Sequence, residues 1–238
     1  ELAIGELAEL LEESQPNVSR HAAPLRQSGL LAVRKEGTRT LLRLSEGART
    51  DAVVTDALAS GRALCHADGG TLYVRNEDRL EFAIMRTDSL GIALGGTTGR
   101  PIALPPLVIR DPVTGQQNLN NVATASAVLK RSFNIVDAYV AEGFDFSGTK
   151  AFDRGNAYRS RSFLTIPLVN QEDHVIGVLQ LLNAIDPATG AVTSFSAEQQ
   201  NIVEALASQA AVALENKLLL DGQAALLESF IKMIASAI

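Results

Sequence analysis

The 238-residue sequence contains a single cysteine, three histidines and no tryptophan. The single cysteine, Cys65, cannot form an intramolecular disulfide, and no cluster of cysteine or histidine residues accompanies it to complete a tetrahedral metal site. We therefore predict that the chain has no metal centre. The simplest interpretation of Cys65 is a small apolar residue of the core.

Long apolar runs are also absent from the sequence. No stretch approaches the roughly 18 consecutive apolar residues that a membrane-spanning helix needs. The first residues do not show the basic-then-apolar order of a secretory signal. These two absences predict a cytoplasmic protein that has no membrane partner.

Motifs of catalysis and of phosphate binding are missing as well. The glycines between Gly95 and Gly99 fit neither the G-x-x-x-x-G-K-[ST] loop nor a strand-linked G-x-G-x-x-G turn. The three histidines are widely spread and no recognisable nucleophile motif accompanies them. Asp145 and Asp153 could in principle act as paired carboxylates, but they lie within a family motif described below. We expect a non-catalytic protein.

The composition that remains is that of a folded protein with unevenly distributed charge. Hydrophobic residues make up 46% and charged residues 20%, and the length favours two domains. The net charge of −6 argues against a wholly basic nucleic-acid binder. One segment nevertheless has a basic excess, with a single acid, Glu36, against six cations: Arg20, Arg26, Arg34, Lys35, Arg39 and Arg43.

The first thirty residues contain the pattern of two helices. Leucines between Leu7 and Leu11 recur at the i, i+3 and i+4 spacing of an amphipathic helix that ends near Glu13. Ser14 suits a helix N-cap and Pro16 a first helical turn, so a second helix is predicted to run to about residue 27.

A strand hairpin is predicted next, over residues 30–34 and 39–44, around a glycine-containing turn. The whole run reads GELAELLEESQPNVSRHAAPLRQSGLLAVRKEGTRTLLRL and resembles the winged helix-turn-helix of ArsR-type repressors. The resemblance implies binding to double-stranded DNA. It does not imply metal sensing, because the first helix lacks the cysteine pair that many metal-sensing members carry.

Base-reading and phosphate-binding side chains occur where helix-turn-helix geometry needs them, at the start of the second helix and in the hairpin. The predicted DNA-binding residues are Gln15, Asn17, Ser19, Arg20, His21, Arg34, Lys35 and Arg39. The alternative is that this region makes only protein contacts.

The remaining chain alternates between helical and strand patterns. A helix is expected at 51–64, strand pairs at 70–74 with 80–85 and at 163–169 with 175–182, and further helices at 123–132 and from Ser196 onward. The stretch 91–118 contains glycine and proline pairs and is expected to be rich in loops.

Several separated pieces of this region occur in the order of a known family: ADGGTLYV, IVDAYVAEGFDFSGTKAFDRGNAYRSRSFLTIPL, HVIGVLQLLNA and SFSAEQQNIVEALASQAAVAL. Together they resemble the GAF domains of cyclic-nucleotide phosphodiesterases and of bacterial HD-type signalling phosphohydrolases. The resemblance implies a small-molecule pocket over an antiparallel sheet. The candidate ligand-binding residues are Phe82, Asp137, Tyr139, Ser162, Phe163 and Thr165.

A cyclic nucleotide is the candidate ligand that this resemblance suggests, although the matching residues are incomplete. Asn183 and Phe195 fit the set found in cyclic-nucleotide-binding members. Ala184 stands where that set has a lysine, and Gln199 and Gln200 stand where it has acids, so the salt bridge of those members cannot form. The identity of the ligand therefore stays open.

The fold class expected is α+β, with a small winged helix at 1–50, a GAF domain at 51–214 and a C-terminal signalling or dimerisation helix at 215–238. The apolar positions of that last helix need a cover, which favours a homodimer. The leading hypothesis is a ligand-responsive transcription regulator. The alternatives are a sensory fragment of a cyclic-nucleotide or cyclic-di-GMP signalling enzyme, and a dimerisation scaffold with an empty pocket.

Overall fold

The computed structural model describes residues 2–3, 14–16, 31–37, 39–44 and 48–235. The chain divides into two compact units, Glu1–Ala52 and Val53–Ile238. Each unit is described by itself, and helix α3 (Ala48–Cys65) carries the chain from the first to the second.

The N-terminal unit contains the predicted hairpin. Strands β2 (Leu31–Glu36) and β3 (Arg39–Leu44) pair antiparallel, which confirms this element. Gly37 in the turn has a φ of 61°, a left-handed conformation that glycine adopts without strain. A short strand that the sequence pattern did not predict, β1 (Leu2–Ala3), pairs with β3. The two predicted helices lie almost entirely outside the described residues, so the winged helix as a whole stays a prediction.

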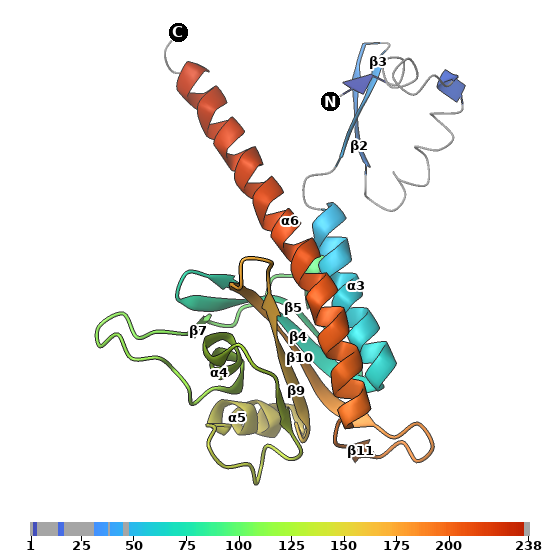
Figure 1. The fold of residues 1–238 in the computed structure, drawn as a ribbon. Helices are drawn as coiled ribbons and strands as arrows, with labels where there is room; N and C mark the ends of the chain where they lie inside the picture. The colour runs from blue at the N-terminus through green and yellow to red at the C-terminus, as the bar shows by residue number, and fades with distance from the viewer. Residues whose placement is uncertain (1, 4–13, 17–30, 38, 45–47, 236–238) are drawn as a thin grey trace. The chain divides into compact units, whose positions relative to one another are not determined.

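The C-terminal unit is built on one antiparallel sheet of eight strands (Figure 1). The path of the sheet is β6-β5-β4-β10-β9-β8, with β7 paired to β5 and β11 to β10. The bounds are β4 (Ala67–Asn76), β5 (Arg79–Thr87), β6 (Ile92–Gly95), β7 (Leu107–Val108), β8 (Phe133–Ile135), β9 (Phe163–Val169), β10 (Val175–Ile185) and β11 (Val192–Thr193). The two predicted hairpins are therefore confirmed as β4–β5 and β9–β10.

Helices cover both faces of this sheet because its central strands are apolar on both sides. On one face α3 and α6 (Ala197–Ala235) lie side by side over a core that includes Leu58, Leu179 and Val203 (Figure 1). On the other face lie α4 (Val122–Leu129), which packs over Val178, and α5 (Ser147–Asn156), whose preceding residue Phe146 packs against Phe163. The sheet therefore separates the long helices from the short ones.

The helix ends follow local chemistry. Ser196 and Gln199 form a reciprocal capping box at the start of α6: the Gln199 amide donates to Ser196 Oγ at 3.1 Å, and the Ser196 amide donates to Gln199 Oε1 at 2.8 Å. Helix α4 ends at Leu129, earlier than predicted, because Lys130 turns into a left-handed conformation with a φ of 50°.

Helix α6 continues over 39 residues without a break at 214, the position of the predicted domain boundary. Between β6 and β7 the chain forms only the 3-10 turn Gly96–Thr98 among its regular elements, as the loop-rich prediction for this stretch requires. Among the described residues, no helix has the combination of length and apolar character needed to cross a membrane.

Candidate functional site

A cavity of about 330 Å³ lies on the face of the sheet that carries α4 and α5. Strands β4, β5 and β10 supply one wall, through residues such as Thr71, Thr87 and Gln180. The N-terminal turns of α4 and α5 and the loop before β7 supply the rest of the lining. A cavity of this size over a sheet is typical of a small-molecule site.

Aromatic side chains dominate two parts of the lining. Tyr73 and Phe82 pack with ring centroids 4.8 Å apart, and Phe146 and Phe163 pack at 5.5 Å. Phe152 of α5 also lines the cavity. Two of the predicted ligand-binding residues, Phe82 and Phe163, are therefore brought to the same cavity.

The polar groups of the cavity wall include a buried chain of hydrogen bonds. Tyr73 donates its hydroxyl to Gln180 Oε1 at 3.3 Å, and Gln180 Nε2 donates to Thr165 Oγ1 at 2.9 Å. Burial raises the pKa of the Tyr73 hydroxyl, so it stays a neutral donor. Thr165, a predicted ligand residue, lies one hydrogen bond behind the lining and holds Gln180 in place.

Asp137, another predicted ligand residue, is placed outside the cavity lining. Its carboxylate lies 3.1 Å from Arg159 Nη2 and 3.6 Å from Arg161 Nε, and accepts the Tyr139 amide at 2.9 Å. Burial by itself would raise the pKa of Asp137, but the Tyr139 amide and the two guanidinium groups lower it below its usual value. The ionised Asp137 carboxylate therefore holds the segment Arg159–Arg161, which leads into β9.

Tyr139 also lies outside the lining and serves a buried carboxylate. Its hydroxyl donates to Asp153 Oδ2 at 2.8 Å, and Asp153 accepts two more bonds, from the amide and the hydroxyl of Ser160, at 2.8 Å each. Asp153 is almost fully buried, whereas Asp145 is exposed and accepts the amide of Ser147, the first residue of α5, at 2.8 Å. Both carboxylates therefore have hydrogen-bond partners within the protein.

Ser162, the last of the predicted ligand residues, faces the strand β11 instead of the cavity. Its hydroxyl donates to the Thr193 carbonyl at 2.6 Å and accepts the Ala184 amide at 3.1 Å. These contacts tie the residue just before β9 to β11 and to the far end of β10.

Two residues at the positions of the cyclic-nucleotide-binding set, Asn183 and Gln199, make hydrogen bonds within the protein. Asn183, with a φ of 54°, accepts the Arg161 amide at 2.7 Å and donates to the Tyr158 hydroxyl at 2.9 Å. Gln199 Nε2 donates to the Cys65 carbonyl at 3.1 Å, which links the start of α6 to the end of α3. Cys65 itself is fully buried, and burial raises the pKa of its thiol to about 11, as its interpretation as a core residue requires.

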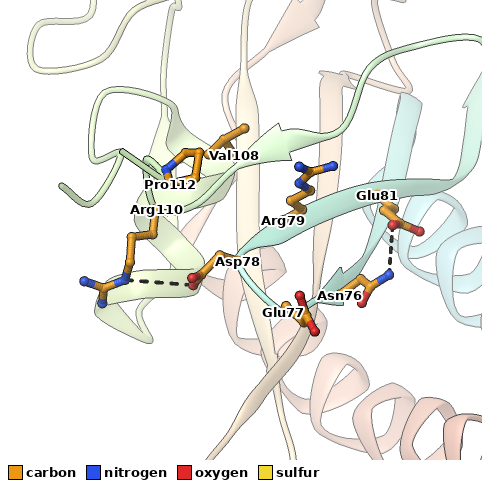
Figure 2. A pocket seen from close by; sticks show the side chains of 8 residues that line it. All are labelled: Asn76, Glu77, Asp78, Arg79, Glu81, Val108, Arg110 and Pro112. Carbon is orange, nitrogen blue, oxygen red and sulfur yellow. Dashed lines mark hydrogen bonds and ion pairs between the residues drawn. The ribbon is translucent and has the colours of Figure 1, made fainter. Parts of the chain in front are cut away.

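A second hollow lies at the β4–β5 turn, with a volume of about 470 Å³ (Figure 2). Its lining is exposed and charged, and Arg110 Nε lies 3.9 Å from Asp78 Oδ1 while Asn76 donates to Glu81 at 3.0 Å. Because water already solvates these groups, the hollow offers little desolvation to a ligand. The aromatic cavity, with its largely apolar lining, is the better candidate site.

The predicted DNA-binding residues are only partly described. Gln15 is exposed, and Arg34 and Lys35 are exposed on β2. Arg39 opens β3. The others, Asn17, Ser19, Arg20 and His21, lie outside the described residues.

Sequence reasoning missed the polar lining residues Thr71, Thr87 and Gln180. A signal for Gln180 was present, since it is the one polar residue in the otherwise apolar run Val178–Leu182. A polar side chain in the middle of a buried strand needs a partner or a ligand.

The comparison with family models returns the GAF domain over residues 49–214, which is most of the chain. The chain belongs to the GAF domain family. The residues that line the cavity all lie within this GAF domain, the family that the sequence motifs resemble.

Two solved GAF domains illustrate the likeness. The blue-light absorbing form of the PixJ GAF domain from Thermosynechococcus elongatus has a TM-score of 0.50 and 19% identity, covering 79% of this chain and 97% of that one. A GAF domain/HD domain protein from Geobacter sulfurreducens has a TM-score of 0.49 and 17% identity, over 74% of this chain and 99% of that one. At this identity the PixJ likeness shows the fold alone.

A different relative matches a short part of the chain. The arsenical resistance operon repressor of Escherichia coli (strain K12) is 51% identical over 45 residues, which are 19% of this chain and 38% of the repressor. The chain therefore spans less than half the length of this curated relative.

Proposed function

We propose that this protein is a ligand-responsive transcription regulator, in which a small molecule bound by the GAF domain controls DNA binding by the N-terminal region. The observation that carries the proposal is the placement of the cavity. It shares strands β4 and β10 with the core under α3, and α3 continues directly into the N-terminal unit.

The route from cavity to helix is short. Thr71 and Tyr73 of β4 face the cavity side, while Leu72 between them packs in the core with Leu58 of α3. A ligand that shifts β4 would therefore change the surface against which α3 packs. Such coupling requires that the ligand bind two arrangements of the sheet with different affinity.

Two observations support DNA as the partner. The first is the 51% identity over 45 residues to a protein named as an operon repressor. The second is the basic hairpin β2–β3, on which Arg34 and Lys35 are exposed. Exposed cations on a wing are suited to phosphate contacts, which position a helix-turn-helix on the duplex.

The test is binding of the purified chain to random duplex DNA across a salt series, followed by fluorescence anisotropy. Specific release of counterions predicts a linear fall of log affinity with log salt, with a slope of about 0.9 per neutralised phosphate. The variant Lys35→Ala should lower the affinity for DNA. It should also reduce the slope by about 0.9, the change expected for the loss of one phosphate contact.

Arg100→Ala is the matched control, because Arg100 is an exposed cation of the C-terminal unit. This variant should leave both affinity and slope unchanged. Absence of duplex binding even at low salt would contradict the regulator and leave the sensory fragment as the better account.

A further inference from the structure

The cavity has an unusual charge balance for a site expected to hold a phosphate group. Asp145 is the one charged side chain among the described residues that line it, and no lysine or arginine is found there. A cyclic nucleotide would bring a phosphate into this lining without a cation to neutralise it. Burying an unpaired charge is strongly unfavourable.

Cations near the cavity are already bound elsewhere. Arg86, next to Thr87 on β5, donates to the carbonyls of Met85, Leu94 and Gly95. Alternate residues of a strand face opposite sides, so Arg86 points away from the cavity that Met85 and Thr87 line.

The arginines of the segment that leads into β9 are likewise engaged. Arg159 and Arg161 both approach the Asp137 carboxylate, and Arg161 also donates to the Val192 carbonyl at 2.8 Å. Lys150 lies 5.3 Å from the centre of the Tyr139 ring, outside the lining. Turning one of these groups toward a phosphate would break contacts that hold the fold.

The aromatic content of the lining suits a flat ring system. The pairs Tyr73–Phe82 and Phe146–Phe163 present ring faces and edges from the sheet and from the start of α5. Aromatic pairs contribute about 0.5–1.5 kcal/mol beyond the burial of their area. A planar ligand can extend these pairs.

One polar group in the lining lacks a partner. Thr87 is 3% exposed, and its hydroxyl makes no hydrogen bond with any other residue that the structure describes. The other two buried polar residues of the lining are occupied, since Gln180 donates to Thr165 and Ser160 donates to Asp153. Gly69 makes room for this side chain, because a Cβ there would lie 3.0 Å from Thr87 Oγ1.

From these observations we infer that the cavity binds an uncharged planar aromatic molecule with one hydrogen-bonding group, and that Thr87 makes the hydrogen bond that selects it. The inference rests on the sensor part of the proposed function and names the chemical class of its ligand. A molecule bound in the cavity would give the Thr87 hydroxyl a hydrogen-bond partner that no described residue supplies.

Naphthol and naphthalene are suitable probes, because they share the ring system and differ by one hydroxyl. Binding to the full chain is followed by the fluorescence of each probe, which is free of tryptophan background. The hydrogen bond predicts that Thr87→Val weakens naphthol binding by about threefold to tenfold and leaves naphthalene within about twofold.

Thr55→Val is the matched control. The Thr55 hydroxyl on α3 is also buried without a partner among the described residues, but Thr55 does not line the cavity. This variant should bind both probes like the original chain. Because threonine and valine have the same shape, and neither hydroxyl has a protein partner, both variants are expected to fold.

Three results would overturn the inference: no binding of naphthol up to its solubility limit, equal weakening of both probes by Thr87→Val, or displacement of naphthol by cyclic AMP or cyclic GMP at micromolar concentration. Failure of naphthol binding with intact DNA binding would count against this inference alone. Absence of DNA binding with intact naphthol binding would count against the regulator alone.

Discussion

Asp153 and Asn183 hold the segment 158–162 at the rim of the cavity through several hydrogen bonds each. Asp153 accepts from Tyr139 and twice from Ser160, and Asn183 bonds the backbone of Arg161 and Arg159. Buried polar side chains of this kind are stabilising only when every partner is present. They place Ser160 in the lining without contacting the cavity themselves.

Asp137 gives the fold a predictable response to acid. The pKa of Asp137 is lowered in the folded protein, whereas the pKa of an aspartate in an unfolded chain is about 3.9. The unfolded state therefore binds more protons, and the stabilisation is complete above the unfolded pKa and is lost as pH falls through the folded pKa. Urea midpoints measured from about pH 6 to pH 3 should fall less steeply for Asp137→Asn than for the original chain.

Asp173→Asn is the comparison variant for this experiment. The pKa of Asp173 is also lowered, by the hydrogen bond and charge of Lys130, but this pair is exposed to water. Solvent screening makes such pairs weak, so its acid response should change less than that of Asp137→Asn. An identical pH profile for Asp137→Asn and the original chain would contradict the anchor role of Asp137.

At the residue scale the sequence identified Phe82 and Phe163 as candidate cavity residues. It could not separate them from Asp137, Tyr139, Ser162 and Thr165, because residue type does not reveal which way a side chain points. In the structure the polar candidates have protein partners at 2.6–2.9 Å. Only the tertiary contacts show this.

Helix α5 is the one helix of the C-terminal unit that the sequence pattern missed. Its residues SGTKAFDRGN include two glycines and several other residues of low helix propensity, so the local sequence does not favour a helix. Tertiary contacts support the helix instead: Asp145 accepts the Ser147 amide at its start, and Asp153, buried on the helix itself, accepts two hydrogen bonds from Ser160. Short elements that line a site depend on such tertiary partners more than on propensity.

Strand β10 contains a glycine that the packing requires. A Cβ at Gly177 would lie 2.5 Å from the Tyr73 carbonyl and 3.1 Å from Leu214 of α6. Because backbone cannot yield, Gly177→Ala should destabilise the protein by about 1–3 kcal/mol. The measurement is the free energy of unfolding in urea.

Gly222→Ala is the opposite case within α6. A Cβ at this helical, exposed position would meet nothing within 4 Å. The variant should be more stable by about 0.5–1 kcal/mol, because alanine has the higher helix propensity. If Gly177→Ala proved as stable as Gly222→Ala, the close approach of β4, β10 and α6 would be wrong.

For the whole molecule, α6 retains an apolar outer stripe. Val212 and Leu219 are 42% and 60% exposed and lie seven residues apart, which places them on one side of the helix. We predict that a second copy of the chain covers this stripe in a homodimer. Leu219→Glu should shift the sedimentation equilibrium toward the monomer.

Gln171→Glu controls for the added negative charge, because Gln171 is exposed in the turn between β9 and β10 and lies outside α6. It should leave the oligomeric state unchanged. A monomeric original chain at high concentration would show that the dimer prediction is wrong.

The sequence by itself determined the order of the main elements, the GAF family and the buried state of Cys65. These follow from periodicity, capping residues and motif order, which are local properties of the chain. The tertiary structure decided which polar residues bond to other parts of the protein and on which face of the sheet the cavity lies. It also decided that no cation among the described residues lines the cavity. Those features depend on segments far apart in sequence, such as Asp137 with Arg159 and β5 with α5, so no local pattern contains them.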